Sequence, residues 1–139
     1  MVDEGRVARL LRGITARTDR LRDATERPVR DRDDLWLDGI KYLFVTAIEG
    51  CVDVAQHIAS SEGFRPPDSN ADALRLLGEH GVIEPTLASD LASAVGFRNV
   101  LVHQYTVVDD ALVVAALDRL DEFDRLVAEV SAWTLDQPE

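Results

Sequence analysis

The sequence has little cysteine and no long apolar run. Cys51 is the single cysteine in 139 residues, which excludes an internal disulfide framework and any CxxC zinc or redox site. No stretch approaches the roughly 18 apolar residues of a membrane-spanning helix. The first residues form no apolar signal core either. These absences favour a cytoplasmic protein in which Cys51 is a small core residue.

Positive charge is also scarce over most of the chain. The formal net charge is −11, from 26 acids and 15 bases, which argues against a broad nucleic-acid-binding surface. Residues 1–34 contain nine arginines and eight acids, whereas residues 35–139 contain six bases and 18 acids. Any phosphate contact in the longer, acidic part therefore depends on very few side chains, and Arg98 is one of them.

Strand-like alternation is missing as well. Val107 and Val108 could suggest a strand, but no second alternating segment exists to pair with it. Apolar residues instead recur at steps of three and four, which predicts helices throughout. The expected helices cover about 7–21, about 35–60, a short segment at about 71–80, a segment that begins at Pro85, and a last segment that opens at Asp109 and Asp110.

These elements predict an all-α fold. We expect a single domain over residues 1–139, built as an antiparallel bundle of four long helices plus one short helix. No internal repeat, low-complexity tract or linker interrupts it. Gly96 lies inside the expected fourth helix, where glycine costs about 1 kcal/mol relative to alanine. We therefore expect a close backbone approach there, from a neighbouring helix or from the dimer mate.

Local signals mark the ends of these helices. Asp33 or Asp34 can cap the second helix at its N-terminus. Ser69, followed by Asp72, resembles a capping box at the start of the short helix. Gly81 suits the left-handed cap at the end of that helix.

The stretch with the most chemical capacity lies near the end of the fourth helix. It reads Arg98-Asn-Val-Leu-Val-His103-Gln-Tyr105. Asn99 and His103 are four residues apart and share a helix face. Arg98 and Tyr105 nearly eclipse each other if the helix continues. Arg98 and His103 are about 140° apart, so they converge only near a helix end or across an interface with another chain.

This set of side chains suits phosphodiester cleavage of RNA without a metal. His103 can take the proton from a ribose 2′-hydroxyl, and Arg98 can stabilise charge on the phosphoryl oxygens. Asn99 can orient the imidazole or the phosphate. Such an in-line attack gives a 2′,3′-cyclic phosphate. The other histidines, His57 and His80, lack an HExxH-type partner set, so no metal or other cofactor is expected.

The pattern Arg-x4-His-x-Tyr resembles the signature of the HEPN superfamily, specifically the HepT toxins of two-gene toxin–antitoxin systems. Residues 42–49, 74–81 and 97–105 look like segments of that family. The resemblance implies a homodimer whose cleft brings together Arg98 and His103 of both subunits. It implies a metal-independent endoribonuclease that acts on RNA, with tRNA and mRNA both open as substrates.

The resemblance also implies a partner. This partner is a minimal nucleotidyltransferase antitoxin of the MntA type, which would silence the toxin by transferring AMP from ATP to Tyr105. Negative charge and bulk at that position would repel RNA and fill the cleft beside Arg98. An alternative function is a non-catalytic helical subunit that binds a nucleotide or substrate beside a nucleotidyltransferase, which the acidic balance of residues 35–139 favours.

Each candidate also has a structural interpretation. Arg98 can be a helix-end arginine paired with an acid, and His103 an interface histidine. Tyr105 can be a core-edge residue, and Asn99 can simply cap or bridge.

Two further groups of polar residues are expected to be structural. Glu49, Asp53 and His57 share one helix face, where a polar seam is favoured over a metal site. An N-terminal arginine stripe is favoured as a solvated face rather than an RNA track. Its members are Arg6, Arg9, Arg17 and Arg20.

Overall fold

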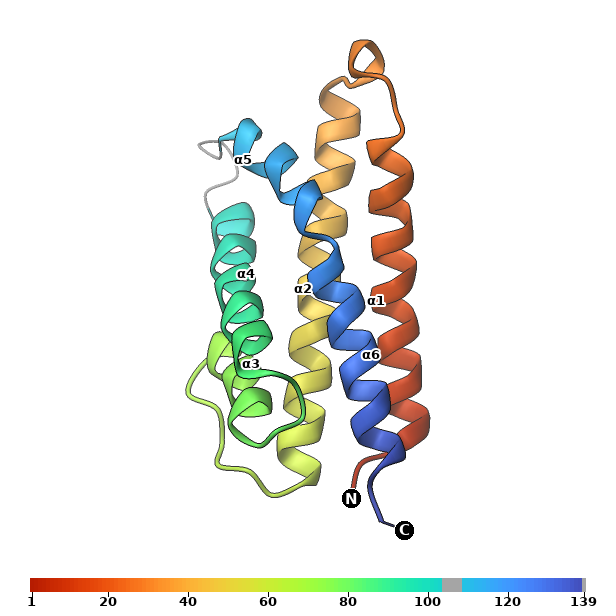
Figure 1. Ribbon diagram of the computed structural model, residues 1–139. Coiled ribbons are helices and arrows are strands. Elements are labelled where there is room, and N and C mark those ends of the chain that lie inside the picture. Colours follow the sequence, from red (N-terminus) through yellow and green to blue (C-terminus); the bar gives the residue numbers. More distant parts are fainter. Residues whose placement is uncertain (104–108, 139) are drawn as a thin grey trace.

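The fold is known from a computed structural model, which describes residues 1–103 and 109–138 (Figure 1). The elements in chain order are α1 (Glu4–Thr25), the short 3₁₀ turn η1 (Val29–Asp31), α2 (Asp34–Ser61), α3 (Asn70–Glu79), α4 (Pro85–His103), α5 (Asp110–Ala115), the 3₁₀ turn η3 (Ala116–Arg119) and α6 (Asp121–Leu135). Every regular element within the described residues is helical, as predicted. Val107 and Val108 lie outside the described residues.

Helix α2 is the centre of the bundle. It packs against α1 and α6 on one side and against α3 and α4 on the other, as Figure 1 shows. Its buried side chains repeat at helical spacing and form the middle of the hydrophobic core. Cys51 is among them, at 1% exposure, and burial raises the pKa of its thiol. None of the described helices is long and apolar enough to cross a membrane.

The predicted helix ends are confirmed. The Asp33 side chain accepts a hydrogen bond from the Trp36 backbone N–H at 2.9 Å and caps α2. Ser69 caps α3 in the same way, through the Asp72 backbone N–H at 3.0 Å. Asp72 does not complete a capping box with Ser69, because its carboxylate accepts from the Asp68 backbone N–H at 2.8 Å instead. Gly81 follows α3 with a φ of +72°, the left-handed conformation expected there.

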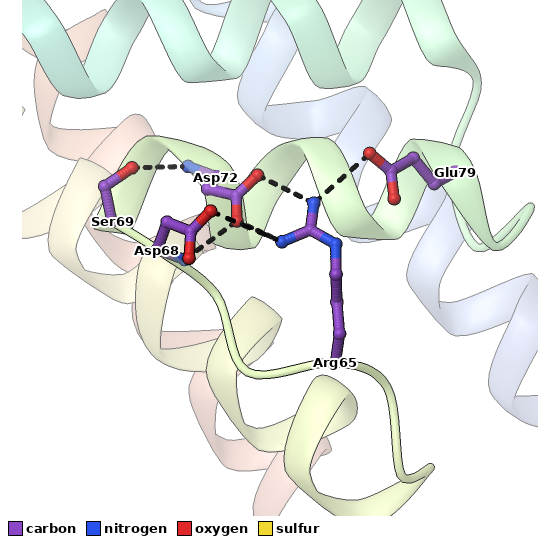
Figure 2. A network of polar contacts seen from close by, with 5 residues as sticks. All are labelled: Arg65, Asp68, Ser69, Asp72 and Glu79. Carbon is purple, nitrogen blue, oxygen red and sulfur yellow. Dashed lines mark hydrogen bonds and ion pairs between the residues drawn. The ribbon is translucent and has the colours of Figure 1, made fainter.

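The segment between α2 and α3 is tied down by one arginine (Figure 2). The Arg65 guanidinium donates to both oxygens of Asp72, at 2.7 and 3.0 Å, and reaches Glu79 at 3.4 Å. Asp68 lies 3.9 Å away. These bonds hold the pKa of Asp72 well below its ordinary value, at about 2, chiefly because the guanidinium stabilises the carboxylate. We call Arg65, Asp68, Asp72 and Glu79 the α3 cluster.

The expectation of one continuous last helix is wrong. The chain instead forms α5, the 3₁₀ turn η3 and α6, with a visible bend between α5 and α6 (Figure 1). The reason is packing, since α5 lies against α2 whereas α6 packs mainly on α1. A straight helix could not bury Val113 and Val130 against both neighbours, and the tighter 3₁₀ turn allows the change in direction.

The close approach expected at Gly96 is not made by another described helix of this chain. A Cβ added at Gly96 would meet no described atom within 4 Å, so no neighbouring helix of this chain approaches there. Approach of a dimer mate stays a prediction. Close packing is found instead at Gly50, where a Cβ would lie 2.9 Å from Ile14, and at Gly78, where it would lie 2.7 Å from Ala88. Periodicity alone gave no sign of these two contacts.

Candidate active site

Arg98 lies on the side of α4 that faces α2. Its Nη2 donates to the Glu49 Oε1 atom at 2.7 Å, and its Nη1 donates to the Asn99 Oδ1 atom at 3.1 Å. The Arg98 side chain is 22% exposed, against 45% for Glu49. Packing fixes the orientation of α4 at this point. Phe97, the residue before Arg98, packs edge-on against Phe44 of α2, with ring centroids 5.9 Å apart.

A polar cavity of about 290 Å³ opens beside this ion pair. Its lining comes from α2, from the first residue of α3 and from α4: Glu49, Val52, Asp53, Gln56, Asn70, Val95 and Arg98. The Gln56 amide nitrogen donates to the Asn70 side-chain oxygen at 3.1 Å, which joins α2 to the start of α3. The cavity therefore holds one cation, two carboxylates and two amides, which is a hydrogen-bonding surface rather than an apolar one.

Asp53 has a perturbed acidity in this cavity. It lies one turn beyond Glu49 on the same face of α2. Partial burial raises the pKa of Asp53, and the negative charge of Glu49 raises it further. Two carboxylates on one face, only one of them paired with Arg98, thus make the cavity wall locally acidic.

His103 is the last residue of α4 and is exposed, as is Asn99 one turn earlier. The two share a face, as predicted from their spacing. Within the chain, Arg98 joins Asn99 and Glu49, but His103 is not among the residues that line the cavity. Arg98 and His103 therefore do not share that cavity within the single chain. Tyr105 and Gln104 lie outside the described residues.

The structural interpretation of Arg98 is correct in one respect, since the residue is paired with an acid. The polar seam on α2 also agrees with the structure. Glu49 pairs with Arg98, while the His57 Nε2 atom accepts a hydrogen bond from the Asp3 backbone N–H at 3.2 Å. Burial and the nearby Arg6 charge lower the pKa of His57. Within residues 1–103 and 109–138, no three His, Cys, Asp or Glu side chains are grouped to hold a metal ion.

The N-terminal arginine stripe is largely a solvated face. Arg6, Arg9 and Arg20 are exposed, and Arg17 is half-buried and donates to the Thr46 hydroxyl at 3.1 Å. This agrees with the interpretation that we favoured for the stripe.

Sequence reasoning missed the pairing of Glu49 with Arg98. The spacing of Glu49, Asp53 and His57 on α2 marked a polar face, but nothing in it selected the partner of Arg98 from the other acids. The missing information was the rotation of α4 against α2, which depends on tertiary packing. The available signal was that Glu49 is a polar residue within a largely apolar stretch of α2.

The family model described as "Ribonuclease HepT-like" matches residues 10–130, which include Glu49, Arg98 and His103. The chain is 31% identical over 85 residues to the "mRNA nuclease HepT" of Shewanella oneidensis, covering 60% of this chain and 64% of that protein. It is 27% identical over 88 residues to the "tRNA nuclease HepT" of Aphanizomenon flos-aquae, covering 63% and 60%.

The chain thus spans 64% and 60% of the length of these two relatives, which is less than two thirds of each. Among solved structures, it superposes with a TM-score of 0.84 on a tri-AMPylated HEPN toxin of Shewanella oneidensis in complex with an MNT antitoxin. That likeness covers 91% of this chain and 96% of the other, at 23% identity. At this identity it shows that the fold is shared.

Proposed function

The chain belongs to the HepT-like ribonuclease family, and on that premise we propose that it is the ribonuclease toxin of a toxin–antitoxin pair. The observation that carries the proposal is the setting of Arg98. A guanidinium from a long helix borders a polar cavity, inside a family match that also contains His103. Arg98 and His103 are the proposed catalytic residues, with Asn99 in support.

The proposed reaction is an in-line transesterification within RNA. His103 accepts the proton of the ribose 2′-hydroxyl, whose oxygen bonds to phosphorus as the bond from phosphorus to the 5′-oxygen breaks. Arg98 N–H groups stabilise the charge that builds on the non-bridging oxygens. The leaving 5′-oxygen takes a proton from a second acid, and the products are a 2′,3′-cyclic phosphate and a 5′-hydroxyl.

A homodimer supplies what one chain lacks. Arg98 faces α2 and His103 ends α4 on an exposed face, about 140° round the helix. Two copies related by a two-fold axis would place His103 of one copy near Arg98 of the other. The partner's His103 would then be the second acid. The exposed faces around Gly96 and Asn99 leave room for such an approach.

A cleavage assay with purified protein tests this function. RNA is incubated with the wild-type chain and with His103→Ala in the presence of EDTA, and both proteins are checked for folding by circular dichroism. We expect cleavage by the wild type, and loss of about 100-fold or more in the variant. Undiminished cleavage by folded His103→Ala protein would refute the assignment.

We further propose that an MntA-type nucleotidyltransferase silences the protein by AMPylation of Tyr105. The chain has two tyrosines, Tyr42 and Tyr105, so the acceptor can be assigned without ambiguity. Tyr42 is 60% exposed on α2 and is the matched control. After reaction with the transferase and ATP, intact mass should rise in steps of about 329 Da. The rise should persist in Tyr42→Phe and disappear in Tyr105→Phe, and the reverse pattern would contradict the proposal.

The alternative, a non-catalytic binding subunit, has one observation in its favour. The cavity beside Arg98 is acidic, because both Glu49 and Asp53 line it, and a carboxylate disfavours an RNA phosphate. This alternative predicts association with ATP or with a nucleotidyltransferase, and no RNA cleavage by the wild-type chain.

A further inference from the structure

We infer that Glu49 is a positioning residue for Arg98, a role that rests on the proposed ribonuclease function and extends it. The carboxylate lies on α2, outside the Arg-x4-His-x-Tyr stretch. It acts through the guanidinium and is not expected to touch RNA. Its contact with Arg98, at 2.7 Å, is the one hydrogen bond among the described residues that fixes the Arg98 side chain to another helix.

The hydrogen bonds divide the guanidinium into a held part and a part that remains available. Arginine has five N–H donors. Within the described residues, one is given to Glu49 and one to Asn99, which leaves three for a phosphoryl group. A guanidinium held from two sides keeps one orientation, so less conformational freedom is lost when the substrate binds. Without Glu49, only the adjacent Asn99 would hold the head group.

The contact that positions Arg98 is also expected to weaken substrate binding. Glu49 brings a negative charge within a few ångströms of the site where a phosphate would meet Arg98, and like charges repel. Removing the charge should therefore tighten RNA binding, while removing the hydrogen-bond acceptor should slow the chemical step. A role in overall stability would not separate KM from kcat in this way.

Two variants of Glu49 separate these effects, with Asp53→Asn as the matched control. Glu49→Gln keeps an oxygen that can accept from Arg98 but removes the charge, whereas Glu49→Ala removes both. Asp53→Asn removes one charge from the same cavity and the same helix face, without an ion pair to Arg98 among the described residues.

Steady-state kinetics on a defined RNA should give the following pattern. Glu49→Ala lowers kcat about tenfold with no rise in KM. Glu49→Gln keeps kcat within about threefold of the wild type and lowers KM. Asp53→Asn removes a negative charge from the same cavity, so it should lower KM as Glu49→Gln does, without the tenfold fall in kcat expected of Glu49→Ala. Wild-type kcat in Glu49→Ala, or a loss no larger than that of Asp53→Asn, would overturn the inference. An equal loss in both Glu49 variants would assign the effect to charge and would also overturn it.

A second measurement keeps this test separate from that of the proposed function. Restricted rotation of the Arg98 guanidinium is followed by ¹⁵N NMR at low temperature, with the signal assigned by its loss in Arg98→Lys. We expect slow rotation in the wild type and Glu49→Gln, and fast rotation in Glu49→Ala. Absence of RNA cleavage by the wild type would remove the proposed function, while unchanged rotation in Glu49→Ala would remove the positioning role.

Discussion

Arg65 and Arg98 both pair with carboxylates that lie on other segments of the chain, but the surroundings of the two guanidinium groups differ. Arg65 donates to both oxygens of Asp72 and also reaches Glu79 and Asp68, so acids surround it (Figure 2). Arg98 contacts one acid, Glu49, and one amide, and it borders a cavity.

The difference indicates how a structural arginine is distinguished from a functional one. In the α3 cluster the positive charge is fully matched, so the guanidinium has little to offer a phosphate. Arg98 is held in place with part of its donor capacity free of contacts among the described residues. Free donors beside a cavity are what substrate binding requires, whereas Arg65 gives three hydrogen bonds to two carboxylates and ties a loop to a helix.

The largest expected effect comes from replacing each arginine with alanine. Arg98→Ala should lower the rate of RNA cleavage about 100-fold or more, because the charge that develops on the phosphoryl group loses its partner. Arg65→Ala should leave the rate within about twofold and slightly lower the free energy of unfolding. Cleavage kinetics and thermal melts of both variants check this. A slow but fully stable Arg65→Ala protein would remove the distinction between the two arginines.

A smaller contrast is expected between two glycines near the same arginines. Gly78 lies in α3, where a Cβ would be 2.7 Å from the Ala88 Cβ and 3.3 Å from the Pro85 Cα. Gly78→Ala should therefore destabilise the chain by about 1 to 3 kcal/mol. Gly96→Ala meets open space within the described residues and should stabilise the helix by about 1 kcal/mol.

Urea unfolding measures both glycine effects, and size-exclusion chromatography adds the oligomeric state. A stable Gly96→Ala variant that no longer dimerises would identify Gly96 as the point where the dimer mate approaches. Destabilisation of the isolated Gly96→Ala chain would contradict the open face that the structure shows.

The smallest effect is a pH dependence confined to the α3 cluster. The folded pKa of Asp72, about 2, lies below its ordinary value of 3.8, so its contribution to stability is full above that ordinary value. The contribution is lost as the pH falls towards 2. The difference in unfolding free energy between the wild type and Asp72→Asn should therefore shrink between pH 5 and pH 2. A constant difference over this range would mean that the ion pair does not set the pKa.

Much of the fold could be predicted because it is specified locally. The Asp33 and Ser69 side chains cap by accepting from backbone N–H groups three residues on, and Gly81 adopts a left-handed conformation, so all three could be identified from the sequence. The break between α5 and α6 could not, because the apolar residues from Val113 to Val130 recur at steps of three and four as they would in one helix, and only tertiary packing separates their partners.

The candidate site likewise has residues that could be predicted from local spacing and one that could not. Arg98, Asn99 and His103 were found because they are polar residues at close spacing in an apolar helix. Glu49 lies 49 positions before Arg98, and the ion pair depends on how α4 is rotated against α2. A pattern of neighbouring residues carries no information on that rotation.

The most direct test of the central claim is cleavage of an RNA oligonucleotide that carries a single 2′-deoxy nucleotide on the 5′ side of the mapped cut. If His103 and Arg98 promote attack by the ribose 2′-hydroxyl, that linkage should resist cleavage. The all-ribose control should yield a fragment ending in a 2′,3′-cyclic phosphate, identified by mass spectrometry. Cleavage of the deoxy-substituted linkage at the wild-type rate would contradict the account.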